Sequence, residues 1–167
     1  MERPKNQATL CIPLHENKVL LGMKKRGFGA GKYNGFGGKP IKREKIEETA
    51  VWELYGESGL KCYIGNLKKV AEFDFFFPHK PEWNQIVHVY LISKFFGKLQ
   101  ETKEMAFQWF DKEKIPYHQM WDDDKHWLPL ILEGKTLNAT FIFKEENGEN
   151  IVDHKKIKIQ ARVAQPG

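Results

Sequence analysis

The feature that most constrains this chain is a glycine-rich segment that leads directly into a stretch dense in carboxylates. Residues 27–38 hold six of the fourteen glycines, so many backbone positions there can adopt conformations that other residues rarely reach. Five glutamates then follow within residues 44–57 of a chain whose net charge is +5. We predict a long loop over residues 27–38, followed by a helix over residues 45–57, because apolar residues recur there at helical spacing and Gly59 ends the pattern.

Length and composition narrow the class of protein. A chain of 167 residues with 41% hydrophobic content suits one folded domain of about 150 residues, and this content excludes a disordered chain. No apolar run approaches the ~20 residues that span a bilayer, and residues 1–7 lack the apolar core of a secretory signal. Cys11 and Cys62 are too few for a disulfide scaffold or a four-cysteine zinc site. We expect one domain over residues 1–167, without a membrane partner, located in the cytoplasm and also in the nucleus or mitochondria.

The rest of the chain predicts strands around two helices. Apolar, β-branched and aromatic runs predict strands over residues 8–14, 19–23, 70–77, 86–92, 108–110, 139–143 and 151–159. A second helix is predicted after three aspartates at 122–124. Pro129 is tolerable in this helix only within about its first turn, where backbone N–H groups lack intrahelical partners anyway. Strands interspersed with two helices predict an α+β fold, a mixed β-sheet sandwiched between α-helices.

Two glutamates of the first predicted helix could hold a cation. Glu53 and Glu57 lie four residues apart and therefore share one helix face. Like charges in that relation destabilise an isolated helix by a few tenths of a kcal/mol, and a divalent cation between them would reverse the sign. Mg²⁺ suits such a site because it binds through few carboxylates, several waters and substrate phosphates. The alternative is a solvated acidic helix face without a metal.

Seven residues in this region match the signature of a known family at fixed spacing. That signature reads Gly, five residues, Glu, seven residues, Arg-Glu, an aliphatic residue, any residue, Glu-Glu, any residue, Gly and an aliphatic residue. The matching residues are Gly38, Glu44, Glu53, Leu54, Glu57, Gly59 and Leu60. The chain therefore resembles the Nudix hydrolases, and this resemblance implies the Nudix fold. Two positions depart from the box, since Trp52 stands where the family has Arg and Gly56 where it has the first Glu of the pair.

The resemblance extends to the branch of the family that hydrolyses oxidised purine nucleoside triphosphates, such as 8-oxo-dGTP and 2-oxo-dATP. Residues 20–31, 34–39, 104–105 and 120–129 carry this wider similarity. It implies Mg²⁺-dependent hydrolysis to a monophosphate and diphosphate, which sanitises the nucleotide pool and prevents DNA damage. Asp122 departs from the family, which has Pro at this position. The segment after residue 153 is longer and more basic than in the family.

The resemblance also implies the site residues. The metal ligands implied are Gly37, Glu53, Glu57 and Glu104, of which the three glutamates are also the catalytic residues. Glu44 is expected to orient the loop and the helix. The expected substrate-binding residues are Thr9, Lys24, Phe28, Asn34, Gly38, Phe73, Phe75, Trp121, Asp123 and Asp124. Aromatic walls suit a purine and Lys24 suits phosphates, although an exposed lysine on a strand edge is the alternative for Lys24.

The adjacent carboxylates of Asp123 and Asp124 suit recognition of a base edge. In a partly apolar pocket both cannot ionise cheaply, so we expect one pKa to be raised. A protonated Asp donates a hydrogen bond while its ionised neighbour accepts one, which suits both oxidised guanine and oxidised adenine. The alternative is that the aspartates at 122–124 only form a favourable acidic N-terminus for the second helix.

The two departures from the box leave the activity open. Trp52 cannot form the charged pair that the family's Arg is thought to make, and Gly56 both removes a carboxylate and weakens a helix by ~1 kcal/mol relative to Ala. The sequence therefore predicts a slow or narrowed hydrolase, with a non-catalytic nucleotide-binding protein as the alternative. A nucleic-acid-binding module is a third class, but no RRM, KH or zinc-finger signature occurs. We expect a small-molecule nucleotide as partner, no nucleic acid and a monomer.

Overall fold

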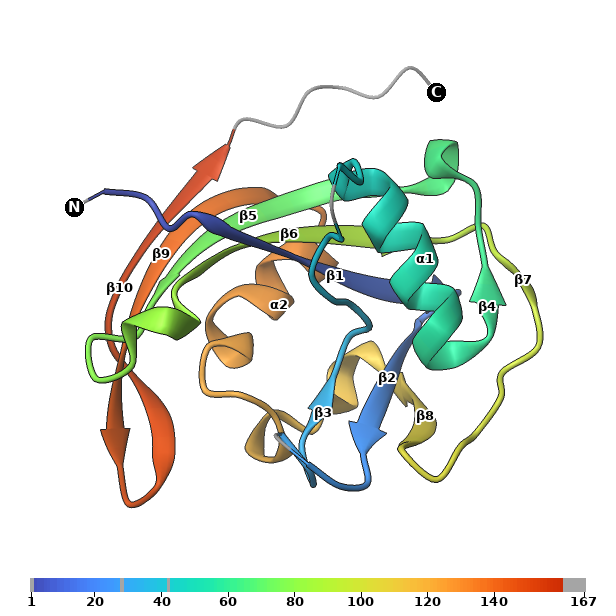
Figure 1. The fold of residues 1–167 in the computed structure, drawn as a ribbon. Coiled ribbons are helices and arrows are strands. Elements are labelled where there is room, and N and C mark those ends of the chain that lie inside the picture. Colours follow the sequence, from blue (N-terminus) through green and yellow to red (C-terminus); the bar gives the residue numbers. More distant parts are fainter. Residues whose placement is uncertain (1, 28, 42, 161–167) are drawn as a thin grey trace.

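The computed structural model describes residues 2–27, 29–41 and 43–160, and Figure 1 shows its fold. The strands are β1 (Asn6–His15), β2 (Lys18–Lys24), β3 (Tyr33–Asn34), β4 (Leu60–Lys61), β5 (Lys68–Phe76), β6 (Gln85–Ile92), β7 (Phe96–Gly97), β8 (Met105–Asp111), β9 (Thr136–Glu146) and β10 (Glu149–Gln160). The α-helices are α1 (Ile46–Ser58) and α2 (Asp124–Leu132), and short 3₁₀ helices span Ile64–Asn66, Pro81–Trp83, Lys112–Lys114 and Tyr117–Gln119. In this described part, neither helix is long and apolar enough to cross a membrane.

The strands form one large mixed sheet. Its order is β10-β9-β5-β6-β1-β2-β3, and β8 pairs with β2 beside this path. The pairs β1–β6 and β5–β9 are parallel, whereas the other neighbours are antiparallel. The short strands β4 and β7 pair separately. This arrangement confirms the predicted α+β class with a mixed sheet.

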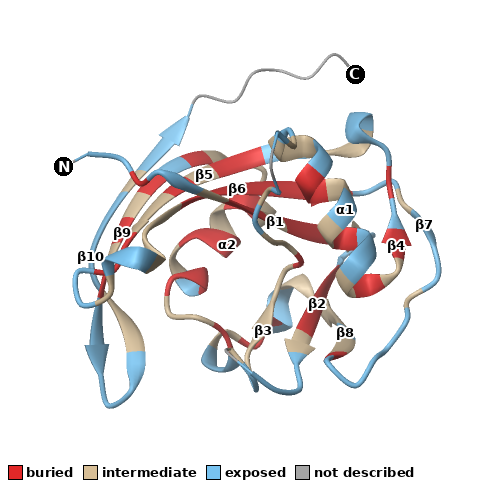
Figure 2. Ribbon diagram, in the orientation of Figure 1, coloured by how far each residue is buried: buried red, intermediate tan, exposed pale blue. Residues whose placement is uncertain are grey.

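The two helices cover opposite faces of the central strands. Cys11 of β1 belongs to a buried cluster with Leu54 of α1, whereas the next residue, Ile12, belongs to a cluster with Trp127 of α2. Successive residues of a strand point to opposite faces, so this alternation places one helix on each side. Figure 2 shows the buried residues concentrated in β1, β5 and β6, while β10 at the sheet's edge is largely exposed.

The position of Pro129 within α2 differs from what the sequence led us to expect. It is the sixth residue of α2, beyond the first turn to which we expected a tolerable proline to be confined. Proline has no N–H for the carbonyl four residues earlier, so α2 lacks one intrahelical bond there. The helix still forms because Trp127 and Ile131 are almost completely buried against the sheet, and burying each such side chain contributes about 2 kcal/mol.

Candidate active site

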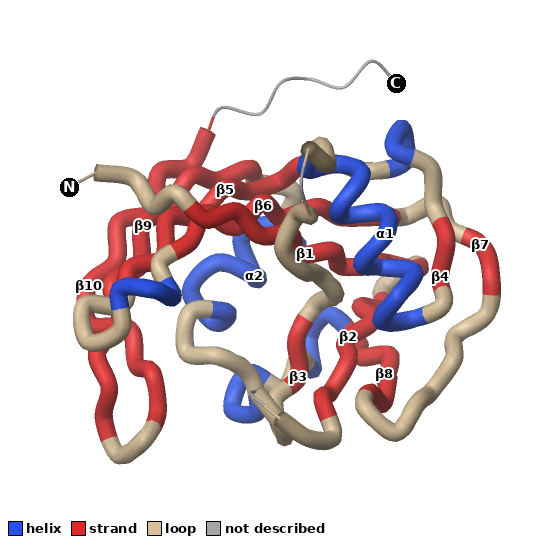
Figure 3. The backbone as a smooth tube through the Cα atoms, in the orientation of Figure 1, coloured by secondary structure: helices blue, strands red, loops and turns tan. Residues whose placement is uncertain are grey.

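The end of the glycine-rich loop is fixed against β1. On its way from β3 to α1 the loop passes β1 (Figure 3), and Phe36 exchanges both backbone hydrogen bonds with Cys11, at 2.5 and 2.8 Å. The Thr9 N–H donates to the Gly38 carbonyl at 2.9 Å. A Cβ at Gly37 would overlap the Thr9 carbonyl oxygen, so only glycine allows this close approach. The strip at residues 35–38 therefore has a defined position immediately before α1.

Two carboxylates of α1 meet this glycine strip. The Gly37 N–H donates to Glu57 Oε1 at 2.7 Å. The Glu53 carboxyl lies against Gly38, where an added Cβ would be 2.5 Å from Glu53 Cδ. The helix face that the sequence predicted thus points at the loop rather than into solvent.

The electrostatic environment of these carboxylates favours a cation. Burial raises the pKa of Glu57 to about 7; the Gly37 N–H opposes this shift, Glu53 adds to it and Lys24 opposes it. Burial, followed by the charge of Glu44, also raises the pKa of Glu53. Both groups therefore resist carrying a negative charge in the metal-free protein, and a nearby divalent cation would offset that cost.

The oxygen donors here fit Mg²⁺. Glu53 and Glu57 supply carboxylates, and hard cations take oxygen ligands of this kind. The Gly38 carbonyl already accepts from the Thr9 N–H, so the Gly37 carbonyl is the better backbone ligand. Gly37, Glu53 and Glu57 are also among the residues that the resemblance implies as metal ligands.

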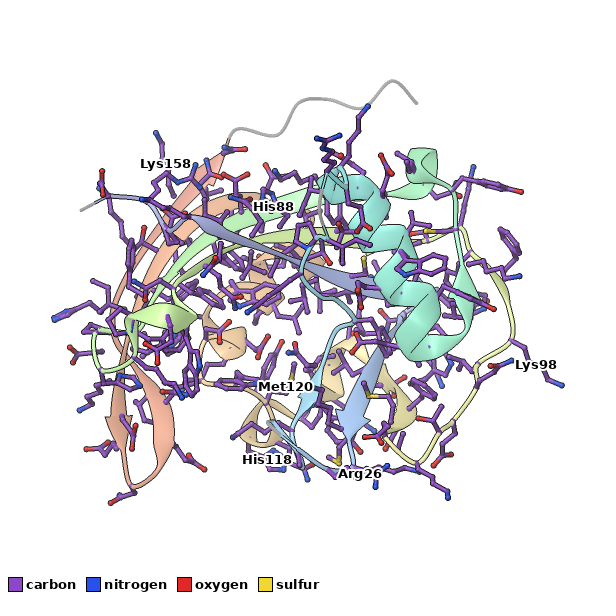
Figure 4. The ribbon with its side chains drawn as sticks, viewed as in Figure 1. Arg26, His88, Lys98, His118, Met120 and Lys158 are labelled. Carbon is purple, nitrogen blue, oxygen red and sulfur yellow. The ribbon has the colours of Figure 1, made fainter. Side chains whose placement is uncertain are left out.

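Glu104 is not brought to the other two glutamates. Its carboxylate pairs with Arg26, whose Nε donates at 2.8 Å, and this bond holds the pKa of Glu104 below its usual value. Its side chain is 61% exposed, and Figure 4 shows Arg26 at the lower rim of the molecule. Within the described ranges no group of three or more acidic, His or Cys side chains is placed to hold a metal. The described residues therefore do not bring the three expected glutamates together, and Glu104 pairs with Arg26 instead.

The other box residues serve the geometry of the helix. Glu44 accepts a hydrogen bond from the hydroxyl of Thr49 in α1, and Leu54 is fully buried. Gly59 ends α1 with a positive φ of 85°, and Leu60 begins β4 as a buried residue. These positions fix where the helix starts, packs and ends.

The two departures from the box lie on the outer surface of α1. Trp52 is 63% exposed, with its ring centroid 6.3 Å from that of Tyr55. Gly56 is also exposed, and a Cβ there would meet no atom within 4 Å. Neither residue contributes a charge to the carboxylate pair, and neither position is sterically closed to a larger side chain.

A cavity of about 420 Å³ adjoins the carboxylates and contains most of the predicted substrate residues. Those lining it are Thr9, Lys24, Asn34, Gly37, Gly38, Glu57, Phe75, Trp121, Asp123 and Asp124. Phe28 lies outside the described residues. Sequence reasoning missed Lys32, Phe77, Trp83, Gln85 and Phe143, which also line it. The spacing of two from Phe75 could have indicated Phe77, whereas Phe143 comes from the remote strand β9.

Phe73 was expected to form an aromatic wall of the substrate pocket, but it does not line the cavity. It is fully buried, and its ring centroid lies 4.9 Å from that of Trp127 and 5.4 Å from that of Phe141. Phe75 faces the same side of β5 two residues further on, and it does line the cavity. Phe73 therefore supports the wall from the core instead of touching a ligand, because α2 covers its end of the strand.

The aspartate pair is buried at the start of α2. Asp123 Oδ2 accepts a hydrogen bond from Trp127 Nε1 at 2.7 Å and makes no capping bond to the helix. Burial raises the pKa of Asp123 to about 6. Burial, with the charge of Asp123 as the next cause, raises the pKa of Asp124 well above its usual value. A merely favourable helix N-terminus does not explain two buried carboxyl groups that face a cavity.

The fold and the box residues together indicate which protein family the chain belongs to. The family model described as "NUDIX domain" matches residues 4–131 of the chain. The chain belongs to the Nudix family, as the box residues implied. Nudix hydrolases act on small-molecule nucleotides and generally use divalent metal ions.

Two similar proteins have names that specify a substrate class, and one solved structure has a similar fold. The chain is 43% identical to the zebrafish (Danio rerio) "Oxidized purine nucleoside triphosphate hydrolase", over 91% of this chain and 94% of that protein. It is also 43% identical to the mouse (Mus musculus) protein of the same name, over 83% and 87% of the two chains. Among solved structures, a mutator MutT protein from Bacillus halodurans shares the fold with a TM-score of 0.72 at 19% identity, covering 91% of this chain and 97% of that one.

Proposed function

We propose that this protein is a Mg²⁺-dependent pyrophosphohydrolase of oxidised purine nucleoside triphosphates, which releases a monophosphate and diphosphate. One observation carries the proposal: a single cavity is lined both by Glu57 of the carboxylate pair and by the buried Asp123 and Asp124. The names of the zebrafish and mouse relatives support the substrate class.

The triphosphate end depends on charge neutralisation and on a positioned water. Glu53 and Glu57, with the Gly37 carbonyl, would hold the Mg²⁺, which when bound neutralises phosphate oxygens. Lys24 lines the same cavity and supplies a second positive charge to the phosphates. The Gly37 N–H fixes one oxygen of Glu57, so the other oxygen remains available. To act as a further ligand or base, Glu104 must leave Arg26.

The base end depends on paired donors and acceptors. Asp123 accepts the Trp127 indole N–H, which suits the ionised form, whereas burial and then the charge of Asp123 raise the pKa of Asp124, which suits a neutral acid that donates. Trp127 occupies one oxygen of Asp123, which fixes the carboxylate plane. Asn34 accepts the Gly35 N–H through Oδ1 at 2.9 Å, so its amide NH₂ is the group left for a ligand. Phe75 and Trp121 supply apolar wall for the purine.

A nucleotide-binding protein without efficient hydrolysis is the second candidate. The Arg26–Glu104 ion pair and the missing carboxylate at Gly56 favour it, because both reduce the negative charge available to a metal. The cavity would still bind the nucleotide, since its aromatic and polar lining does not depend on these residues.

A nucleotide panel with product identification separates the two candidates. The protein is incubated with 8-oxo-dGTP, 2-oxo-dATP, dGTP, dATP and dCTP, with Mg²⁺ or with a chelator. Release of monophosphate and diphosphate from the oxidised purines, only with Mg²⁺, is the expected result. Binding of 8-oxo-dGTP without turnover at any Mg²⁺ concentration would support the second candidate. We further propose a cytoplasmic monomer without a nucleic-acid partner. Size-exclusion chromatography tests the monomer, and a salt-titrated oligonucleotide binding assay tests the absence of nucleic-acid binding.

A further inference from the structure

The third aspartate of the cluster has a different role from its two neighbours. Asp122 Oδ2 accepts the backbone N–H of Val152 in β10 at 2.7 Å, and Oδ1 accepts from Lys125 Nζ at 2.8 Å. The Asp122 side chain is 18% exposed. Asp122 therefore ties the segment before α2 to a strand thirty residues away in the chain.

The Val152 N–H lies directly beside an irregularity in the outermost strand. The pairing of β10 with β9 shifts register between Val152 and His154, which marks a bulge. Val152 keeps Phe143 as its strand partner, and the extra residue that the shift leaves unpaired is Asp153. The Val152 N–H donates to the half-buried Asp122 carboxylate at this irregularity, so the bond ties the segment of Asp122 to β10.

That segment carries much of the cavity lining. Trp121 and Asp123, the neighbours of Asp122 on either side, both line the cavity, and so does Asp124. One end of the segment is held by the bridge between Met120 and Tyr33, and Figure 4 shows Met120 beside β3. The Asp122 bond ties the middle of the segment to β10, the outermost strand of the sheet.

We propose that Asp122 is a positioning residue for the base pocket: its bond to the β10 bulge holds Trp121, Asp123 and Asp124 in the orientation that binds an oxidised purine. This inference rests on the proposed function. Of the two Asp122 contacts, the bond to the Val152 N–H is the one that holds the segment, because the Lys125 side chain is 52% exposed and an exposed ion pair contributes little to stability.

Three substitutions separate the contact of Asp122 with Val152 from its contact with Lys125. Asp122→Ala removes both, Asp122→Asn keeps an oxygen acceptor for the Val152 N–H, and Lys125→Met removes the ion pair alone. Asp153→Ala is the matched control, since it removes a carboxylate beside Val152 that lies 3.3 Å from His154. For each we would measure kcat and KM for 8-oxo-dGTP, the Kd for the product 8-oxo-dGMP, the midpoint of thermal unfolding and hydrogen exchange at the Val152 amide.

We expect Asp122→Ala to raise KM for 8-oxo-dGTP and Kd for 8-oxo-dGMP about fivefold, with kcat within about twofold of wild type, the effect of losing one hydrogen bond. Asp122→Asn, Lys125→Met and Asp153→Ala should all bind like wild type, and the Val152 amide should stay protected in Asp122→Asn. Unchanged Kd in Asp122→Ala, or a fivefold loss in Asp122→Asn, overturns the proposal. If Asp122→Ala does not fold, Asp122→Ser is measured in its place, with the same expected loss. A wild type that binds 8-oxo-dGMP without hydrolysing the triphosphate overturns the proposed hydrolysis but leaves this test intact.

Discussion

The N–H of Gly37 donates to Oε1 of Glu57 at 2.7 Å, across twenty residues of chain. This bond joins the glycine strip, which is itself fixed on β1, to the most buried carboxylate of the helix face. The position of Glu57 is consequently set by the packing of a loop as well as by the helix that carries it. Substitutions in the loop should therefore affect both folding and catalysis.

Gly37→Ala tests how tightly this loop is packed. An added methyl would overlap the Thr9 carbonyl, and because backbone cannot move as a side chain does, we expect a loss of at least about 3 kcal/mol in the free energy of unfolding. Gly56→Ala is the control, since its methyl meets nothing within 4 Å and a helix gains up to ~1 kcal/mol from this change. Denaturant unfolding measures both. Equal stability of Gly37→Ala and wild type would contradict the close approach.

Glu57→Gln should abolish metal-dependent hydrolysis without loss of the fold. The substitution keeps the shape and one oxygen acceptor for Gly37, but it removes the charge that holds a cation. We expect kcat to fall about 100-fold or more, as when one electrostatic contributor to a transition state is lost. Circular dichroism and thermal unfolding provide the control for folding. Turnover equal to wild type would remove Glu57 from the mechanism.

The raised pKa of Glu57 predicts a pH dependence of stability in the metal-free protein. Its folded value of about 7 exceeds the usual 4.5, so the folded state binds more protons than the unfolded state between these values. This contribution to the free energy of unfolding is therefore present at low pH and is lost as pH rises from about 4.5 to 7. Glu57→Gln should lack it, which pH-resolved denaturant unfolding of both proteins with chelator present would reveal. Added Mg²⁺ should reduce the loss in wild type alone.

Replacement by Asn should have unequal effects at Asp123 and at Asp124. Burial and the charge of Asp123 raise the pKa of Asp124, so the amide of Asp124→Asn resembles the neutral acid that a raised pKa favours. Asp123→Asn instead replaces the acceptor of the pair, and Trp127 loses its charged partner. We expect Asp123→Asn to reduce kcat/KM for 8-oxo-dGTP about tenfold relative to dCTP, and Asp124→Asn to change that ratio less. Equal losses for every nucleotide, pyrimidines included, would count against a role in base recognition.

The features predictable from the sequence are those that depend on local periodicity. The spacing of Glu53 and Glu57 on one helix face, the end of that helix at Gly59 and the alternation in the strands all follow from residues close in sequence. Both helices and all the predicted strands are present, with boundaries that differ by a few residues.

Features that depend on contacts distant in sequence could not be predicted. Phe73 and Phe75 look alike in the sequence, and only the position of α2 above the sheet separates a core residue from a cavity wall. Glu104 could be placed in the metal site only by analogy, because its pairing with Arg26 depends on how β2 and β8 align. The bond from Asp122 to the bulge in β10 is likewise set by register, which sequence pattern alone does not determine.

The two departures from the Nudix box yield the last prediction. If they limit the activity, Gly56→Glu combined with Trp52→Arg should raise Mg²⁺-dependent hydrolysis. Both positions are exposed and Gly56 has free space around it, so the new side chains fit without repacking. Gly56→Glu alone adds a third anion beside Glu53 and Glu57, and this repulsion grows unless a metal is bound. Positions 52 and 56 are i and i+4 on α1, so the new cation can pair with the new carboxylate and offset that repulsion.

The double variant should therefore exceed the combined effect of the two single variants, as expected for coupled neighbours. We expect a gain of ~10-fold, which corresponds to ~1.4 kcal/mol removed from the barrier. Single-turnover hydrolysis of 8-oxo-dGTP by wild type, both single variants and the double variant, across a Mg²⁺ titration, measures it. Gly56→Ala separates helix stabilisation from the added carboxylate, because it provides the first without the second. If the double variant is no faster at any Mg²⁺ concentration, Trp52 and Gly56 do not limit the reaction, and the exchange of Glu104 from Arg26 to the metal becomes the step to examine.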